Sequence, residues 1–599
     1  MHYINIYIKS TLVLFLFLGW GGTIYAQEFL TGSRMNTPIL KEAKQNKDFF
    51  LSSKTNSQPL LLPFFEDFSN YIGFPNERFF IDSQAFVYNT FPVFPPTIGV
   101  VTLDALNQYG EIYPHLNAIS KGADTLTSRF IRLDSLFVGE TGRPITPADS
   151  LYFSFYFQPG GTGITDENPG NKIGNQPDIN DSLVLEFAYT DDFSATIWEH
   201  IWSTPGFNVN VWTSENQYQY FKQVMIPITN EKYLRNNFQF RFRNYASLEP
   251  QQGMIGWEGN VDQWHIDYIR LDVGRNINDV FTNDLAFVNP TTSFLQNYQA
   301  MPWKQFQPAD MKSHFTNYLS NLSNGPRTST YQYSVSRNGE IVRNYSTGAI
   351  DIAPYFSSGT QEKTEQANPP ILSFMPNQLT DTALFVVTHV FQNAAGMDFY
   401  LGNDTCVFEQ KFSDYYAYDD GTAEYGYCLN NQFNIAYLAM KFSLRVPDSL
   451  SAVRMWFNHT KNNENEAASF SIVVWKDNNG APGEKIYTQQ NNNPNFSEQF
   501  LDFWEYQFDE KVPVSGVFWV GFEQQGNVQL NIGFDQNNDS REFFRYNTRG
   551  IWETSAFRGT PMLRAVFGKL NKSTPLIPPK PTTIIGPNPA KNTVLITNY

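Results

Sequence analysis

Two-residue alternation of aromatic and polar side chains is the feature that most constrains this fold. In residues 236–246, Phe238, Phe240 and Phe242 fall on one face of an extended chain, and polar residues fall on the other. Gly, Pro and Asn bound further segments of strand character, which are 149–158, 181–190, 469–477 and 515–523. No helical period runs longer than two turns, so the sequence predicts an all-β protein.

Composition narrows the class of protein. The chain has 599 residues, of which 16% are aromatic and 17% charged, as expected for tandem β-sandwiches with real cores. A formal net charge of −16 argues against a nucleic-acid partner, which needs a basic patch. Two cysteines are too few for a disulfide framework or a zinc cluster.

Shifts of pattern and composition divide the chain. We expect three β-sandwiches in tandem, of which the second has the strand spacing of a small Ig-like sandwich. The predicted segments are a signal peptide (1–26), an N-terminal segment (27–58), three sandwiches (59–274, 280–410 and 411–569), a Pro-rich linker (570–583) and a short final segment (584–599).

The N-terminus predicts export. Lys9 precedes the apolar run 11–20, and Ala26 offers a small residue before Gln27, which is the layout of a signal peptide. The alternative is a buried N-terminal helix. Since no later stretch approaches the roughly 20 apolar residues of a membrane helix, we expect an exported chain with no transmembrane anchor in its mature part.

Motifs for catalysis are lacking in the sequence. The seven histidines are far apart, and HExxH, GxSxG, Walker and GxGxxG patterns are absent, so no catalytic residue is assigned. A glycosidase needs only two carboxyl groups, which no spacing rule reveals. Glu186 with an unidentified partner is therefore kept as the alternative of a glycan hydrolase.

Three groups of residues are candidates for structural calcium or for a ligand. Glu66 and Asp67 near the first strand of the first sandwich can meet Asp267 on its last strand, where calcium favours clustered oxygens. Ordinary edge-strand charges are the alternative. A weaker metal candidate is a polar turn with Asp419, Asp420 and Glu424, whose spacing misses the EF-hand pattern. The ligand candidate is a stacking platform of three tryptophans, Trp198, Trp202 and Trp212, for which core packing is the alternative.

Two further patterns involve covalent chemistry. Cys406 and Cys428 can form a disulfide in an oxidising exterior, or remain two buried thiols. Asp followed by Ser or Thr and an aliphatic or small residue recurs before strands, where it can cap its own turn. The hydroxyl residues of this pattern are Thr125, Ser135, Ser150, Ser182, Thr382 and Ser449.

The last residues carry a resemblance. Pro587, Asn588 and Pro589 open a turn before the apolar run 594–596. This resembles the start of the type A C-terminal sorting domain of cargo of the type IX secretion system, although the chain covers only its first strand. The resemblance implies that the type IX machinery is a partner, and that the protein is secreted or attached to the outer surface.

Much of the remaining chain resembles modular surface proteins of the same bacteria. Residues 62–70 and 264–271 are similar to their N-terminal jelly-roll domain, which is akin to MAM and carbohydrate-binding sandwiches. Residues 415–427, 477–484 and 559–568 resemble the sandwich that often precedes the sorting signal, which implies a second jelly-roll-like sandwich. The resemblance implies a binding or adhesion protein that recognises a glycan or protein through sandwich loops. It also makes the six hydroxyl residues candidate O-glycan acceptors. A structural accessory of a surface or gliding apparatus is a further alternative.

Overall fold

The computed structural model confirms the all-β prediction. Within the described residues, the α-helices are α4 (Val209–Glu215) and α5 (Tyr355–Ser358), and nearly all other regular structure is antiparallel sheet. The structure describes residues 27–33, 58–89, 91–139, 141–160, 162–163, 172–173, 176–190, 195–216, 219–248, 259–366, 382–393, 398–430, 435–459, 464–496, 502–525 and 530–568.

The first sandwich packs a six-stranded sheet against a four-stranded sheet. The six-stranded sheet has the order β13-β8-β15-β4-β3, with β2 also paired to β15. Its strands are β2 (Phe64–Glu66), β3 (Phe86–Tyr88), β4 (Val100–Leu103), β8 (Tyr152–Pro159), β13 (Lys222–Pro227) and β15 (Trp264–Asp272). The four-stranded sheet has the order β12-β11-β14-β5. Its strands are β5 (Lys121–Thr127), β11 (Ser182–Thr190), β12 (Thr196–Pro205) and β14 (Gln239–Ala246).

Two small hairpins extend from the first sandwich, and an aromatic core fills it. The hairpins are β6 (Ser135–Val138) with β7 (Thr141–Pro144), and β9 (Thr162–Gly163) with β10 (Lys172–Ile173). Phe238, Phe240 and Phe242 are fully buried between the two sheets, as the alternation predicts.

The second sandwich packs a three-stranded sheet, β16-β18-β21, against a five-stranded sheet, β17-β23-β22-β19-β20. In the five-stranded sheet, β17 runs parallel to β23. The strands are β16 (Leu285–Phe287), β17 (Ala300–Pro302), β18 (His314–Asn321), β19 (Arg327–Arg337), β20 (Glu340–Ile352), β21 (Gln361–Gln366), β22 (Ala383–Asn393) and β23 (Thr405–Ser413).

The third sandwich includes a strand from the other end of the chain. Its sheets are β1-β25-β30-β32 and β24-β33-β26-β29-β27-β28, with β31 also paired to β26. The strands are β1 (Glu28–Gly32), β24 (Tyr415–Tyr416), β25 (Tyr425–Leu429), β26 (Ile435–Met455), β27 (Phe470–Asn478), β28 (Ala481–Asn492), β29 (Trp504–Gln525), β30 (Ile532–Asp535), β31 (Phe544–Asn547), β32 (Thr560–Pro561) and β33 (Leu563–Phe567).

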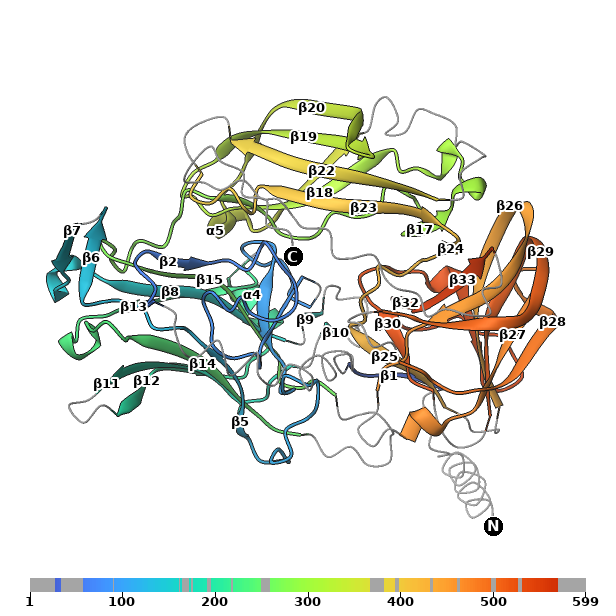
Figure 1. Ribbon diagram of the computed structural model, residues 1–599, viewed down its shortest axis with the longest axis horizontal. Helices are drawn as coiled ribbons and strands as arrows, with labels where there is room; N and C mark the ends of the chain where they lie inside the picture. The colour runs from blue at the N-terminus through green and yellow to red at the C-terminus, as the bar shows by residue number, and fades with distance from the viewer. Residues whose placement is uncertain are drawn as a thin grey trace, which may run out of the picture.

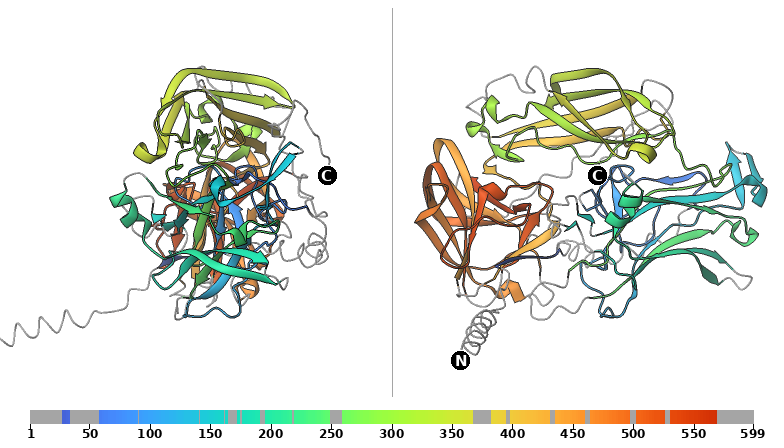
Figure 2. Two further views of the ribbon diagram at one scale, coloured as in Figure 1. Left: turned by 90° about the vertical axis from the view of Figure 1, so that its left-hand side faces the viewer. Right: turned by 180° about the vertical axis from the view of Figure 1, so that it is seen from behind.

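The three sandwiches lie at the corners of a triangle (Figures 1 and 2). The second sandwich covers the six-stranded sheet of the first, and it meets the third through ion pairs such as Arg445–Asp310 at 2.5 Å. Strand β1 completes the triangle, because it belongs to the third sandwich and also contacts Gly259 and Asn260 of the first. The four-stranded sheet of the first sandwich lies on the outside.

Candidate functional site

The four-stranded sheet presents a polar and aromatic surface away from the core. We call this surface the free face and define it by five outward side chains, which are Glu186, Trp198, His200, Arg241 and Arg243. Glu186 lies directly opposite His200 on β12 and Arg241 on β14, so these three share one side of the sheet. Trp198 and Arg243 are two residues from His200 and Arg241 along their strands and therefore lie on the same side. His200 is exposed and the other four are half-buried.

An ion pair orders the centre of the free face. Arg241 Nε donates to Glu186 Oε2 at 2.7 Å, and an Arg243 nitrogen lies 3.7 Å from the same oxygen. The Arg241 guanidinium carbon stands 4.0 Å from the centre of the Trp198 ring, a cation–π contact. Arg241 is therefore fixed on two sides, so the side chains around it are held in place before any ligand arrives.

The three tryptophans do not form the predicted platform. The register between β11 and β12 shifts between Leu185 and Glu186, so Trp202 points into the core against Phe155, at 5.2 Å, while Trp198 stays outside. Trp212 lies on α4, where the ammonium of Lys222 is 4.0 Å from its ring. A β-bulge and a separate helix thus divide residues that sequence spacing had grouped together.

A second group of polar side chains lies where the six-stranded sheet of the first sandwich meets the second sandwich. We call it the junction cluster and define it by five buried carboxyl residues, Asp67, Asp267, Asp284, Asp398 and Asp404. The structure does bring Asp67 and Asp267 together, as predicted: Thr97 Oγ1 lies 3.4 Å from the Asp67 carbonyl oxygen and 3.1 Å from an Asp267 carboxylate oxygen. Glu66 bonds locally instead, accepting from the Phe68 N–H at 2.8 Å.

The second sandwich supplies the partners that sequence reasoning missed. Asn403 Nδ2 donates to Asp67 at 3.0 Å and to Asp284 at 3.2 Å, so it bridges the two sandwiches. Tyr268 donates its hydroxyl to Asp284 at 2.7 Å. Tyr268 has a φ of +53° inside a register shift of β15, and this strained backbone turns its ring toward the second sandwich.

Charge in the junction cluster is poorly compensated. Loss of solvation raises the pKa of Asp67 to about 6 and that of Asp404 to about 8, the latter also through the charge of Asp398. Burial also raises the pKa of Asp267 and that of Asp284 well above their ordinary values. One cation, Arg327, lies 4.0 Å from Asp398. Protons therefore neutralise much of this cluster near neutral pH.

The metal predictions stay predictions. Among the residues that the structure describes, no three His, Cys, Asp or Glu side chains are gathered closely enough to hold a metal ion. In the weaker candidate, Asp419 and Glu424 are buried in the third sandwich and Asp420 is exposed, and donors of the protein itself bind their oxygens. Asp419 pairs with Arg564 at 2.5 Å, and the Thr422 N–H donates to Asp420 at 2.8 Å.

The two cysteines are free thiols and do not form the disulfide considered above. Cys406 lies on β23 of the second sandwich, opposite His389, whereas Cys428 lies on β25 of the third, opposite Phe29. Each cysteine is buried in its own sandwich. Their nearness in sequence therefore does not bring the two sulfur atoms together.

The predicted glycan acceptors differ in accessibility. Ser150 and Thr382 are exposed, and Ser135, Ser182 and Ser449 are half-buried. Thr125, also half-buried, is engaged, since its hydroxyl donates to Asp82 and Gln84 at 2.8 Å. Local capping occurs as well: the Ser449 N–H donates to Asp448 at 2.8 Å. Glycosylation remains a prediction, most accessible at Ser150 and Thr382.

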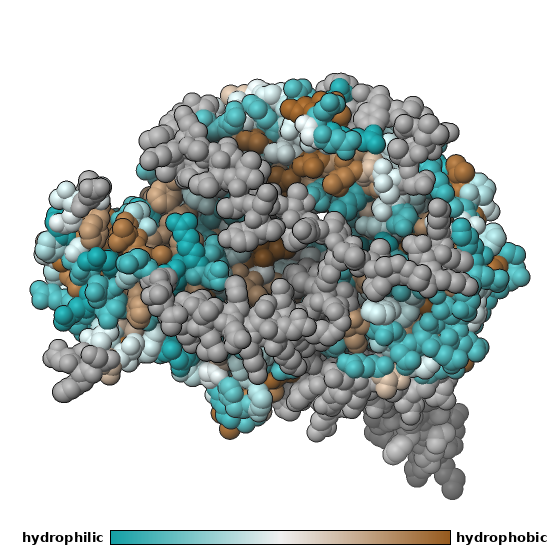
Figure 3. Space-filling model, in the orientation of Figure 1, coloured by the Kyte–Doolittle hydropathy of each residue, from teal (hydrophilic) through white to brown (hydrophobic). Residues whose placement is uncertain are grey.

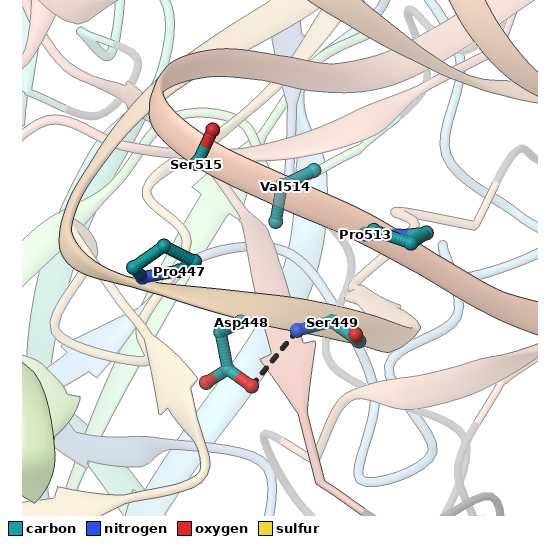
Figure 4. Close-up of a pocket in the computed structure, with 6 residues that line it drawn as sticks. All are labelled: Pro447, Asp448, Ser449, Pro513, Val514 and Ser515. Carbon is teal, nitrogen blue, oxygen red and sulfur yellow. Dashed lines mark hydrogen bonds between the residues drawn. The ribbon is translucent and has the colours of Figure 1, made fainter.

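A shallow hollow of about 400 Å³ lies at the edge of the third sandwich (Figure 4). It is lined by Pro447, Asp448, Ser449, Pro513, Val514 and Ser515. Asp448 is already paired with Lys304 at 2.6 Å, so few polar groups converge on the space. The second sandwich also exposes apolar side chains, among them Leu384 and Val407. Brown, hydrophobic areas are visible over the upper part of the molecule in Figure 3.

Several predictions fall outside the described residues. These include the signal peptide at 1–26, the Pro-rich linker at 570–583 and the sorting residues Pro587, Asn588 and Pro589. In the part of the chain that is described, no helix has the length and apolar character needed to span a membrane.

Comparison with known proteins leaves the family open. No family model and no curated protein matches the chain. Among solved structures, it is similar to a Bacteroides uniformis β-glucuronidase (TM-score 0.20, 10% identity, 51% of this chain and 28% of that one). A glycosyl hydrolase family 2 member from Bacteroides cellulosilyticus gives TM-score 0.20, 10% identity and coverage of 50% and 30%. For a β-galacturonidase from Eisenbergiella tayi the TM-score is 0.18 and the identity 9%, and the match covers 54% of this chain and 45% of that one. The chain spans less than half of each of these proteins, and scores this low support no functional conclusion.

Proposed function

We propose that this chain is an exported binding or adhesion protein, and that the free face of its first sandwich holds a glycan. Support for export comes from the signal-peptide pattern and the sorting-domain resemblance of the sequence. One structural observation carries the site: an uncovered sheet presents Trp198 beside a fixed Arg241–Glu186 pair. An indole next to fixed polar groups can pack against a sugar and hydrogen-bond its hydroxyls.

A glycan array probed with the chain from Gln27 onward tests this function. We expect binding that is clearly weaker in Trp198→Ala. The matched control is Trp504→Ala, because Trp504 is a 40% exposed tryptophan on the third sandwich, and its loss should leave binding unchanged. A blank array, or binding of Trp198→Ala that equals that of the parent, would refute the glycan proposal. If a surface protein were captured instead, the free face would be a protein-binding site.

A glycan hydrolase is the second candidate, favoured by one observation. Asp82 lies beside Thr125 and interacts electrostatically with Arg241, and loss of solvation raises the pKa of Asp82 to about 6. A carboxyl group near this pKa can exchange protons at neutral pH, and Glu186 would be its partner. Turnover of a bound glycan that is lost in both Asp82→Asn and Glu186→Gln would establish this activity. Binding without product would leave the site as a binding module.

A further inference from the structure

Strand β1 pairs with the outer edge of β25 on the third sandwich. We call this edge, with the side chains that contact β1, the groove along β25. The strand pairs antiparallel with β25, Glu28 opposite Leu429 and Gly32 opposite Tyr425, almost 400 residues away in the chain. Phe29 is buried and Leu30 packs against the core. The first strand of the chain therefore completes one of the last sheets.

The acidic residue of β1 is recognised specifically. Glu28 is 6% exposed, and its carboxylate accepts the Tyr427 hydroxyl at 2.5 Å and the Ala556 N–H at 2.6 Å. A buried carboxyl group is costly unless it is hydrogen-bonded, so these donors select glutamate at this position. Burial raises the pKa of Glu28.

The other end of β1 is recognised by shape. Thr31 Oγ1 donates to Asn531 at 3.1 Å, and Asn458 Nδ2 donates to the Gly32 carbonyl at 2.8 Å. A Cβ on Gly32 would stand 3.2 Å from the Gly259 Cα and 3.1 Å from Asn260 Oδ1, tighter than ordinary contacts. Any side chain at this position would have to push these neighbours aside by a few tenths of an ångström, and a branched one by more.

The same end contacts the first sandwich. The Ser33 N–H donates to Asn260 Oδ1 at 3.0 Å, and the Asn260 N–H donates to the Ser33 carbonyl at 3.1 Å. Residues 34–57 separate Ser33 from the first described residues of that sandwich. The segment 27–33 therefore contacts both the third and the first sandwich.

We infer that the groove along β25 is a peptide-binding site for an extended Glu-Phe-Leu-Thr-Gly segment, and that residues 27–33 fill it as a clasp between the third and first sandwiches. Binding follows strand addition, in which main-chain hydrogen bonds give affinity and side-chain pockets give specificity. Because β1 precedes β25 by about 400 residues in the chain, β25 is synthesised after the segment that pairs with it.

Deletion of residues 27–33 from the otherwise full chain tests the site. A fluorescent peptide of residues 27–33 should bind the deleted chain saturably and should not bind the intact chain, whose groove is filled. The Glu28→Ala peptide should bind at least about tenfold more weakly, since it leaves two buried donors unpaired. A Gly32→Val peptide should not bind. Equal binding to both chains, or to the deleted chain regardless of peptide sequence, would overturn the proposal.

A measurement on the intact chain covers the case in which the deleted chain does not fold. In full-length Gly32→Val, hydrogen exchange at the amides of β25 should become faster, while β26 and β29 keep their protection. Gly348→Val is the matched control, since Gly348 lies on β20 of the second sandwich, where an added Cβ would meet open space. Unchanged exchange of β25 in Gly32→Val would show that β1 is not held by this site.

Discussion

The two sheets of the first sandwich share one core but differ in how far their outward side chains are buried. Outward residues of the six-stranded sheet, such as Tyr156, Asp267 and Tyr268, are at most 3% exposed because the second sandwich covers them. On the four-stranded sheet, Glu186 and Arg243 are half-buried, and none of the other sandwiches, as far as their residues are described, lies over them. One sheet is therefore used for assembly, and the other is left for a ligand.

The largest expected effect is on the covered sheet. Tyr268→Ala removes a buried ring and a donor to Asp284, and we expect a loss of about 3–5 kcal/mol in the free energy of unfolding. Urea unfolding followed by tryptophan fluorescence measures this loss. Tyr268→Phe keeps the ring and should lose about 1–3 kcal/mol, because the buried carboxyl group misses one donor. If Tyr268→Ala destabilised the chain no more than Trp198→Ala, the contrast between the sheets would fail.

Alkaline pH should weaken the covered face next. Burial raises the folded-state pKa of Asp67 to about 6 and that of Asp404 to about 8, whereas unfolded carboxyl groups titrate near 4. The folded chain then binds more protons than the unfolded chain, so the stabilisation present below about pH 4 is lost as pH rises through 6 to 8. Thermal melts across this range should fall with pH, and a flat profile would contradict the account.

Asp404→Asn sharpens the pH prediction. The amide keeps the shape and cannot ionise, so the variant should melt like the parent near pH 5 and above it near pH 9. The control is Asp351→Asn, at an exposed position on β20, which should keep the parent's pH slope. An identical slope in Asp404→Asn would remove that group from the junction cluster.

Calcium should give a smaller, pH-dependent shift if the sequence prediction of a site at Asp67 and Asp267 holds. A divalent cation would replace protons, so millimolar calcium should raise the melting midpoint near pH 9 more than near pH 6. A chelator should reverse this rise. A midpoint that is insensitive to calcium and chelator at both pH values would dispose of the calcium prediction.

Sequence alone reached the local structure and missed the long-range partners. Strict alternation at Phe238, Phe240 and Phe242 predicts a half-buried strand because the period of side chains is two. The prediction that Trp198 and Trp202 share one platform was wrong, since a β-bulge between them puts their side chains on opposite faces of the sheet.

The junction cluster and strand β1 depend on contacts between residues that are hundreds of positions apart in the chain. Asp67 and Asp267 were paired from their positions on the first and last strands, but Asn403 comes from a different sandwich, with no signal in its own neighbourhood. β1 is similar: its five residues look like any short apolar strand, and its partner lies at Tyr425–Leu429. Alternation tells which side chains leave a core, and it does not tell what covers them.

The smallest effect on stability is expected on the free face. Trp198 is half-buried on an uncovered sheet, so Trp198→Ala should change the melting midpoint far less than Tyr268→Ala does. A large loss of stability in Trp198→Ala would mean that the free face is structural.

Titration of the parent chain and of Trp198→Ala with the glycan that binds best on the array separates the contribution of Trp198 to binding from its contribution to stability. We expect the variant to melt at nearly the parental midpoint and to bind roughly five- to thirtyfold more weakly, since stacking on an indole contributes on the order of 1–2 kcal/mol. Equal affinity of the folded variant and the parent would contradict this expectation.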